Sequence, residues 1–373
     1  MKIVRILHPW MPEYRVKFFN ELINLGKSSN IRYKIYSGSA PHDSVNRSDE
    51  VIYSEFHEKL NSFNLNLFGR ELIYYLRPKV WQDSDLVIYE HALRNLNAFI
   101  DLVILRKINV ALWGHGRTYT KKKNKLEIFL QRVLITKSMH YFAYTSQGAK
   151  HVKKVSRDKA RVTEVLNSTD TLKLSNQISS IKNQDIIQKY PKKIDTKLIC
   201  VFIGALDKSK NLSFLLDSAE IISHHIPNFE LQIYGDGPLR TKIQTTCNKH
   251  NYLTYCGRAS TEDLAKLSLN AKLILNPGRV GLISVDSLTM GVPIVTTTYK
   301  YHAPEFEYLI HDRNCLVTKE NIQNYAEIVI TTLQDAKKLE TLSQNCIEDS
   351  KIYSVEKMAL NFHSGVLTTL EQL

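Results

Sequence analysis

The sequence lacks any apolar run of the roughly 18 residues that a bilayer-spanning helix needs. Its first residues, 1–8, have too short an apolar core for a signal peptide and are typical of a buried strand. Five scattered cysteines without metal-ligand spacing favour a reducing compartment over a disulfide framework. Long low-complexity tracts are missing as well. These absences predict a globular protein of the cytoplasm.

Positive charge is present in excess and is unevenly distributed. The chain has 373 residues, for which two domains are the better expectation, and a formal charge of +13. Residues 1–170 contain 28 Lys and Arg against 16 Asp and Glu, so nearly all of the excess lies there. A basic half predicts an anionic partner, such as a membrane surface, a diphosphate-linked acceptor or nucleic acid. A basic surface that only keeps the protein soluble is the alternative.

Both halves alternate short apolar strands with helical patterns. The predicted strands are 2–7, 32–36, 86–89, 108–113, 140–144 and 162–165, then 197–203, 229–234, 253–256, 272–276, 293–297 and 315–317. Alternation of this kind predicts an α/β protein with parallel, doubly wound sheets in two Rossmann-like halves. Helical patterns cover 16–25, 93–105 and 354–370. The polar stretch 171–196 is the expected boundary between the halves.

The most informative stretch is 276–287, where an apolar strand enters a Pro-Gly turn and then a helix. The first N–H groups of a helix are unpaired and lie at the positive end of its dipole, so they attract phosphate. Asp286 lies slightly deeper in the helix, where an acid can accept hydrogen bonds from a ribose. The stretch therefore indicates a nucleotide diphosphate, although such turns with glycine are also common as purely structural units.

Two further turns follow strands of the second half. Lys208 and Lys210 lie between a strand and a helix, at the edge where open α/β sheets bind ligands. A lysine in this place neutralises phosphate as a point charge, and a solvated loop is the alternative. The turn 234–240 contains Gly-Asp-Gly-Pro, in which glycines allow unusual backbone and proline suits a first helical turn. This second turn is more typical of structure than of ligand contact.

The ordered set of motifs resembles the retaining, nucleotide-sugar-dependent glycosyltransferases of family 4, which have the GT-B fold. The set comprises the lysine loop, the Gly-Asp-Gly-Pro turn, the Pro-Gly turn with its acid, Gly-Val-Pro-Ile-Val at 291–295 and Val-Leu-Asn-Ser-Thr-Asp at 165–170. The resemblance implies two Rossmann-like domains, 1–170 and 171–350, facing a cleft. It also implies a last helix within 351–373 that crosses back to the first domain.

The resemblance further implies a donor site in the second half. Lys210 matches the lysine that contacts the donor diphosphate. The whole set expected at the diphosphate is Gly204, Lys208, Lys210, Arg279, Val280, Gly281 and Leu282. Asp286 matches the acid that binds the ribose, and the nucleotide-side turns contain Gly235, Gly257 and Arg258. Two positions depart from the family pattern. Gly278 stands where an acid usually meets the donor sugar, and Ala205 stands where an arginine is usual.

In the first half, His115 lies between two glycines directly after a predicted strand. The resemblance implies that this histidine meets the donor sugar, so that His115 and Lys210 are the expected catalytic residues. The family's Gly-rich N-terminal loop is absent, and Tyr14 and Arg15 in its place are candidates for binding the acceptor. Glu305, beside the presumed nucleotide site, is expected either to contact the donor or to cap a helix.

A basic run at 121–125 precedes an apolar helical pattern that continues to 135. Each lysine near an anionic membrane contributes about 1 kcal/mol to binding, so the run predicts contact with such a surface. A solvated helix face is the alternative. The expected location is the cytoplasm, peripheral to the inner face of the plasma membrane.

These observations predict a hexosyltransferase-like enzyme that moves a sugar, with retention, from a UDP- or GDP-sugar to a carbohydrate acceptor. A lipid-linked glycan of lipopolysaccharide or capsule synthesis is the expected acceptor. There is no Asp-x-Asp motif, so neither a metal nor another cofactor is expected. Two alternatives remain open. A nucleotide-sugar epimerase of the same architecture needs acid and base carboxylates that the sequence does not reveal, and a nucleic-acid binder needs a module that is not recognised here.

Overall fold

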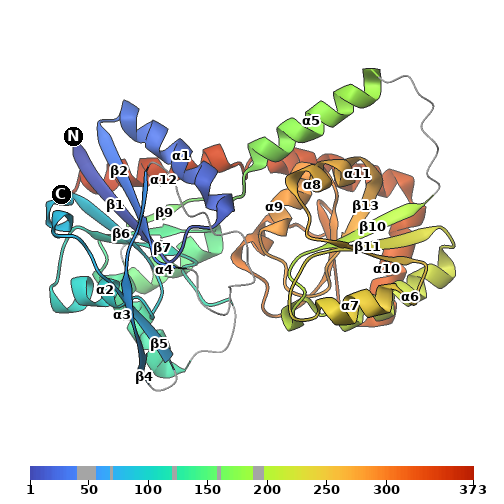
Figure 1. Cartoon of the computed structure of the whole chain (residues 1–373), viewed down its shortest axis with the longest axis horizontal. Helices are drawn as coiled ribbons and strands as arrows, with labels where there is room; N and C mark the ends of the chain where they lie inside the picture. Colours follow the sequence, from blue (N-terminus) through green and yellow to red (C-terminus); the bar gives the residue numbers. More distant parts are fainter. Residues whose placement is uncertain (40–55, 68–69, 120–123, 158–160, 188–196) are drawn as a thin grey trace. The chain divides into compact units, whose positions relative to one another are not determined.

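The computed structural model describes residues 1–39, 56–67, 70–119, 124–157, 161–187 and 197–373. The chain divides into two compact units: unit 1 combines Met1–Asp170 with Val355–Leu373, and unit 2 is Thr171–Ser354 (Figure 1). Each unit contains a parallel sheet with helices on both faces. The predicted α/β class with two Rossmann-like, doubly wound domains is confirmed.

The sheet of unit 1 has the strand order β3-β2-β1-β6-β7-β8-β9, with all neighbours parallel. Its strands are β1 (Lys2–His8), β2 (Ile31–Ser37), β3 (His57–Lys59), β6 (Leu86–Glu90), β7 (Val110–Gly114), β8 (His140–Ala143) and β9 (Val162–Glu164). The central strands are buried almost throughout, because helices cover both faces. The sequence predicts six of these strands and misses the short β3.

A separate antiparallel hairpin in unit 1 consists of β4 (Ser62–Leu67) and β5 (Arg70–Tyr75), and the sequence analysis did not predict it. In β4, polar residues alternate with Phe63 and Leu65, which are 60% and 50% exposed. The strand therefore has the period of 2 that indicates a strand, but its apolar residues do not enter a core. A search for buried apolar runs does not find it.

Two helix layers enclose the sheet of unit 1. On one face lie α1 (Glu13–Ser28) and α12 (Val355–Leu370), which pack side by side (Figure 1). On the other lie α2 (Leu96–Phe99), the π-helical turn η3 (Ile100–Ile104), α3 (Lys125–Lys137) and α4 (Ser146–Ser156), and the 3-10 helix η2 (Lys79–Asp83) adds Trp81 to that core. The predicted helix over 93–105 is thus a short α-helix continued by a π-helical turn.

The sheet of unit 2 has the order β12-β11-β10-β13-β14-β15, again entirely parallel. Its strands are β10 (Leu198–Ile203), β11 (Phe229–Tyr234), β12 (Leu253–Gly257), β13 (Ala271–Leu275), β14 (Ile294–Thr297) and β15 (Cys315–Thr318). From β10 the chain adds β11 and β12 on one side of the sheet and then β13, β14 and β15 on the other side. The sheet therefore has its topological switch point between β10 and β13, where open α/β sheets bind ligands.

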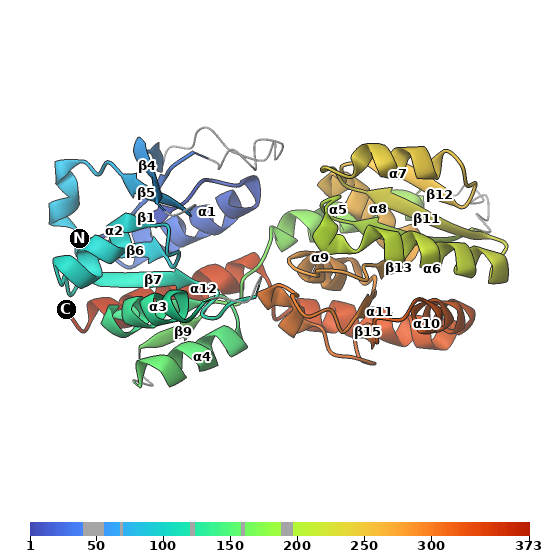
Figure 2. The same cartoon turned by 90° about the horizontal axis from the view of Figure 1, so that it is seen from below.

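The helices of unit 2 also form two layers (Figure 2). One contains α6 (Leu212–His225), α7 (Arg240–Cys247) and α10 (Ile322–Gln334), and the other contains α5 (Thr171–Ile187), α8 (Thr261–Asn270), α9 (Ile283–Met290) and α11 (Ala336–Ser350). Two 3-10 helices, η4 (Lys208–Lys210) and η5 (Pro304–Tyr308), lie in the loops after β10 and β14.

The expected boundary 171–196 is only partly a connection. Residues 171–187 form α5, which packs against α8 and α9. Leu174 and Ile178, four residues apart, are buried in the core of unit 2 even though their neighbours are polar. Residues 188–196 lie outside the described part of the chain. Within the described part, no helix has both the length and the apolar composition required to cross a membrane.

Candidate functional site

Two glycines bring the loops of unit 2 close together at the carboxyl ends of the strands. Gly204 follows β10 and Gly235 follows β11. A Cβ on Gly235 would lie 1.9 Å from the carbonyl oxygen of Gly204, so only glycine fits there. A Cβ on Gly237 would lie 2.7 Å from the carbonyl oxygen of Leu206, whose own N–H donates to Asp236 O at 2.9 Å. The Gly-Asp-Gly-Pro turn is thus a backbone support for the lysine loop.

The lysine loop is held by a local cap. The Asp207 carboxylate accepts hydrogen bonds from the N–H and the hydroxyl of Ser209, at 2.8 and 2.6 Å, and thereby starts η4. Asn211 then adopts a left-handed conformation, with φ of 52°, which turns the chain into α6. This geometry directs Lys210 to the switch point, where its ammonium donates to Arg279 O at 2.5 Å. Lys208, by contrast, is exposed.

Gly278 has a steric reason to be glycine. A Cβ at this position would lie 2.4 Å from both Ser209 O and the carbonyl carbon of Lys210. The two loops are joined there by a hydrogen bond from Arg279 N–H to Ser209 O at 2.8 Å. The lysine loop therefore occupies the space that an acidic side chain at 278 would need. The departure from the family pattern at this position follows from the close approach of two backbone segments.

The amide of Val280 is already used within the protein, which corrects the expectation that it binds diphosphate. Its N–H donates to His302 Nδ1 at 3.1 Å, and His302 Nε2 donates to Thr297 O at 2.9 Å. This pair of bonds fixes a neutral histidine. Burial, together with the charges of Lys210 and Arg279, lowers the pKa of His302 to about 4 despite its bond to Thr297 O. The sequence shows a histidine at 302 but not its bond to a residue 22 positions away.

The start of α9 supplies a different set of backbone donors. In the described part of the chain, no backbone hydrogen bond uses the N–H of Gly281, Leu282 or Ile283. Because residue 281 is glycine, no side chain fills the space in front of these amides. A Cβ there would lie 3.2 Å from the Ala303 methyl carbon and 3.9 Å from a carboxylate oxygen of Glu305. Successive free amides at a helix start, beside a lysine, form an arrangement that binds an oxyanion. The predicted Gly281 and Leu282 belong to it, and Ile283 was missed.

Three other positions complete this edge of unit 2. Asp286 is half-buried in the first turn of α9, and Glu305 is buried with its backbone carbonyl accepting from Ser284 Oγ at 3.0 Å. Asn276, which sequence reasoning missed, is fully buried after β13. Its side-chain amide has no hydrogen-bond partner among the described residues. Buried amides are rarely left so, and Asn276 is therefore a candidate for contact with a ligand or water.

The nucleotide-side turns lie at the neighbouring strand ends. Gly257 ends β12 with φ of 78° and has no heavy atom within 4 Å of its would-be Cβ. Arg258 Nε donates to the Asp236 carboxylate at 3.3 Å, and Gly235 N–H donates to Gly257 O at 2.6 Å. The predicted donor residues of unit 2 therefore share one edge of its sheet, around the ends of β10 to β13.

In unit 1, the His115 loop depends on two facing glycines. A Cβ on Gly116 would lie 2.5 Å from Gly148 O, and one on Gly148 would lie 2.5 Å from His115 O. This contact places His115 on the surface, with its ring 4.9 Å from that of Tyr144. A pocket beside it is lined by residues from β6, β7, their loops and α3, including Glu90, His91, Arg117, Tyr119 and Gln131. Burial raises the pKa of Glu90.

Arg15 is placed otherwise than the sequence predicts. Its side chain is 1% exposed, donates to Asn167 Oδ1 at 2.6 Å and lies over the rings of Trp113 and Tyr144. It holds the core of unit 1 together, so the structure does not support the expected contact with an acceptor. Tyr14 is half-buried, and its ring lies against the Arg15 guanidinium. Among the described residues, no three His, Cys, Asp or Glu side chains are grouped as metal ligands.

Three comparisons bear on this arrangement. Residues 197–335 match the family described as glycosyl transferases group 1. A glycosyltransferase of Methanocaldococcus jannaschii that is called uncharacterized, MJ1059, is 24% identical over 181 residues, or 45% of this chain and 43% of that protein. The match thus spans less than half of the relative's length.

Solved structures resemble the whole chain. HepE (Alr3699) of Anabaena, in complex with UDP, has a TM-score of 0.65 at 14% identity, and both chains are covered fully. Sucrose-phosphate synthase of Thermosynechococcus elongatus has a TM-score of 0.69 at 12% identity, also with full coverage of both chains. At these identities the likeness shows the fold. The chain therefore has the GT-B fold, and its residues 197–335 are similar to the glycosyl transferases of group 1.

Proposed function

We propose that the chain is a retaining, family 4 glycosyltransferase that transfers a sugar from a nucleotide diphosphate donor to a carbohydrate acceptor. One observation carries the proposal. At the switch point of unit 2, the Lys210 ammonium lies at Arg279 O, and the N–H groups of Gly281 to Ile283 lie at the start of α9. A cation and free amides in one place suit a diphosphate better than a neutral ligand.

The chemistry proposed for this site is stabilisation of the leaving group. As the bond between the sugar C1 and the diphosphate oxygen breaks, negative charge develops on that oxygen. Lys210 and the helix-start amides are preorganised to receive the charge, which is the most effective form of electrostatic catalysis. An acceptor hydroxyl attacks C1 and its proton passes to the departing diphosphate oxygen, so that the products are a glycoside and a free nucleotide diphosphate. His115 orients the sugar, and Asp286 binds the ribose.

The donor is proposed to be a UDP-sugar. HepE, whose fold this chain shares, has been crystallised with UDP and with UDP-glucose. A ligand that binds only the folded protein must raise its unfolding temperature. We therefore expect UDP and UDP-sugars, rather than GDP- or dTDP-sugars, to raise the melting temperature, and Asp286→Ala to remove the shift. The donor site is wrong if none of these nucleotides has an effect at saturating concentration.

Transfer is distinguished from epimerisation by the products. A transferase releases UDP only when an acceptor is present, whereas an epimerase converts the donor sugar without any acceptor. Retention is tested by the anomeric configuration of the product in NMR spectra, which should equal that of the donor. The proposal involves no metal or other cofactor, so we expect the rate to be unchanged in the presence of EDTA.

The proposed acceptor is a lipid-linked glycan in the synthesis of a cell-surface polysaccharide such as lipopolysaccharide or capsule. The enzyme would then act in the cytoplasm, peripheral to the inner face of the plasma membrane. The positive charge of residues 1–170 supports this location, because the inner leaflet is anionic. Lipid-linked oligosaccharides should accept the radiolabelled sugar at a higher kcat/KM than the same oligosaccharides without lipid.

A further inference from the structure

The outer face of α3 in unit 1 carries large apolar side chains that no core covers. Leu126 is 62% exposed, Phe129 60% and Ile128 46%, although Leu134 and Ile135 on the inner face of the same helix are buried. A soluble helix normally has its polar residues outside. Contiguous exposed apolar residues of this kind mark an interaction surface. The basic residues 121–123, which precede α3 in the sequence, lie outside the described residues.

A second group of exposed apolar residues lies beside α3. Ile104, Leu105 and Ile108, at and after the end of η3, are 63%, 55% and 78% exposed. The turn η3 packs directly against α3, so both groups belong to one helix layer of unit 1. Ile108 lines a pocket whose charged side chains are all basic, namely Arg106, Lys107, Lys137 and Arg161. The Lys107 ammonium also pairs with the Asp101 carboxylate at 3.3 Å. The pocket holds cations beside apolar side chains, as an anionic amphiphile would require.

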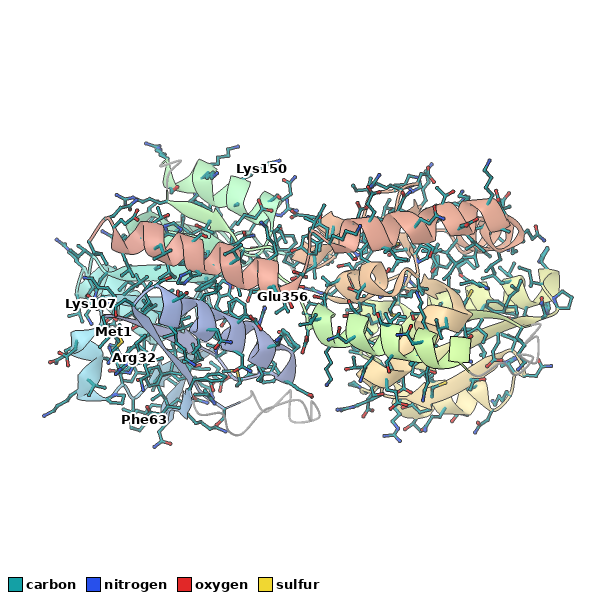
Figure 3. All side chains as sticks on the ribbon, turned by 90° about the horizontal axis from the view of Figure 1, so that it is seen from above. Met1, Arg32, Phe63, Lys107, Lys150 and Glu356 are labelled. Atoms are coloured by element: carbon teal, nitrogen blue, oxygen red, sulfur yellow. The ribbon has the colours of Figure 1, made fainter. Side chains whose placement is uncertain are left out.

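The adjacent helix, α4, is strongly basic. It packs against α3, contains Lys150, Lys153 and Lys154, and has no acidic residue (Lys150 is labelled in Figure 3). Three acids of this layer and its neighbouring strand are bonded within the protein. Glu127 closes the capping box at the start of α3, Glu164 accepts a hydrogen bond from the Ser146 hydroxyl, and Asp101 is fully buried and bonded to Arg77, Tyr89 and Lys107. Cations and exposed apolar side chains therefore share this layer, and these acids are engaged inside unit 1.

We infer that this layer, which we call the α3–α4 face, docks unit 1 on an anionic lipid bilayer. The apolar side chains of Leu126, Phe129 and Ile108 would enter the interfacial region, while the surrounding cations pair with phosphate groups. A second copy of the chain fits the face poorly, because two such faces would bring cations against cations. The inference adds a specific surface to the proposed peripheral location and does not depend on transferase activity.

The position of the face also suits the lipid-linked acceptor of the proposed function. Gln131 of α3 lines the pocket beside His115, so the helix that touches the bilayer also borders the loop expected to meet the sugar. An acceptor held in the membrane by its lipid would then reach the pocket without leaving the bilayer.

The test is sedimentation of the full chain with vesicles. We expect binding to vesicles that contain phosphatidylglycerol and little binding to vesicles of phosphatidylcholine alone. Leu126→Ser with Phe129→Ser should weaken binding at least tenfold, and Lys150→Glu with Lys154→Glu should weaken it by roughly fivefold or more for each lysine changed. The matched controls should bind as the wild type does. They are Phe63→Ser with Leu65→Ser, exposed on the hairpin of unit 1, and Lys242→Glu with Lys249→Glu, exposed on unit 2.

Three outcomes would overturn the inference. These are no binding to phosphatidylglycerol vesicles, equal loss in the control variants, or light scattering that shows a dimer dissociated by the Leu126 and Phe129 changes. All substitutions are at exposed positions, and an unchanged circular dichroism spectrum and melting temperature check that each variant is folded. Vesicle binding needs no donor or acceptor, so its failure is distinguishable from failure of the proposed transferase activity.

Discussion

The two units have the same kind of parallel sheet but differ in how the chain builds them. Unit 2 is one continuous segment. Unit 1 also includes α12, which packs into its core although it is more than 180 residues away from the rest of that unit in the sequence. Residues 1–170 also carry nearly all of the excess positive charge. The family match lies wholly within unit 2. The family match and the excess positive charge thus fall in different units.

The physical basis of the difference is the type of contact at the two sites. In unit 2 the loops meet through backbone, at Gly204, Gly235 and Gly278, and glycine at such places leaves a recognisable pattern. In unit 1 the His115 loop has one such backbone contact, between Gly116 and Gly148, but packed side chains, such as Arg15 over Trp113, surround it. Side-chain packing tolerates many combinations of residues, so its sequence pattern is weaker.

The largest expected effect tests whether the two units are energetically separate. Phe362 of α12 is fully buried and stacks on Phe142, with ring centroids 4.3 Å apart. We expect Phe362→Ala to lower the free energy of unfolding of unit 1 by about 3–5 kcal/mol, measured by urea denaturation. Leu360→Ala, at a 45% exposed position of the same helix, is the control. If UDP affinity falls as well, the separation of the units is wrong, because the residues proposed to bind the diphosphate and the ribose, Lys210, Gly281 to Ile283 and Asp286, all belong to unit 2.

Lys210→Ala tests the donor chemistry of unit 2. Loss of the cation at the leaving diphosphate should lower kcat by about 10²–10³-fold, with a smaller change in the stability of the fold. The measurement is the initial rate of UDP release in the presence of acceptor. Lys208→Ala is the matched control, since Lys208 is two residues away and exposed. Equal losses in both variants would show that general positive charge matters, and not the position of Lys210 at Arg279 O.

The neutral His302 should make unit 2 sensitive to acid. Its folded pKa of about 4 lies below the usual 6.5, so the unfolded state binds more protons in this interval. The stabilisation is complete above pH 6.5 and is lost as pH falls towards 4, by at most about 3 kcal/mol. His302→Gln should flatten this dependence in urea titrations of unit 2, whereas His224→Gln, at an exposed position, should not. Identical slopes would contradict the assigned hydrogen bonds.

The smallest effect concerns the glycine at the sugar end of the site. Gly278→Ala places a methyl group 2.4 Å from Ser209 O, and we expect a loss of about 1–3 kcal/mol in the stability of unit 2. Gly281→Ala is the comparison, because its methyl would lie 3.2 Å from the Ala303 methyl and 3.9 Å from a Glu305 carboxylate oxygen, and the change should cost less. Urea midpoints measure both. A Gly278→Ala variant as stable as the wild type would mean that the lysine loop is not tightly packed there.

Much of the fold could be predicted from the sequence because buried parallel strands are short apolar runs. Strands β1, β10 and β13 agree with prediction within one or two residues. The hairpin β4–β5 was missed because its apolar residues are exposed, and α5 was missed because only Leu174 and Ile178 mark its buried face within a polar stretch. Both errors arise where burial and local composition disagree.

The sequence by itself determined the class of most elements of the two parallel sheets and the order of the motifs, since these depend on neighbours within a few residues. Only the tertiary structure decided which backbone amides and side chains of these motifs stay available to bind a ligand. The amide of Val280 is taken by His302, Arg15 is buried in unit 1, and Gly278 is required by the backbone at Ser209 and Lys210. Each of these facts depends on a contact between residues 22 to 152 positions apart. Such contacts exist only after the chain has folded, and no local pattern encodes them.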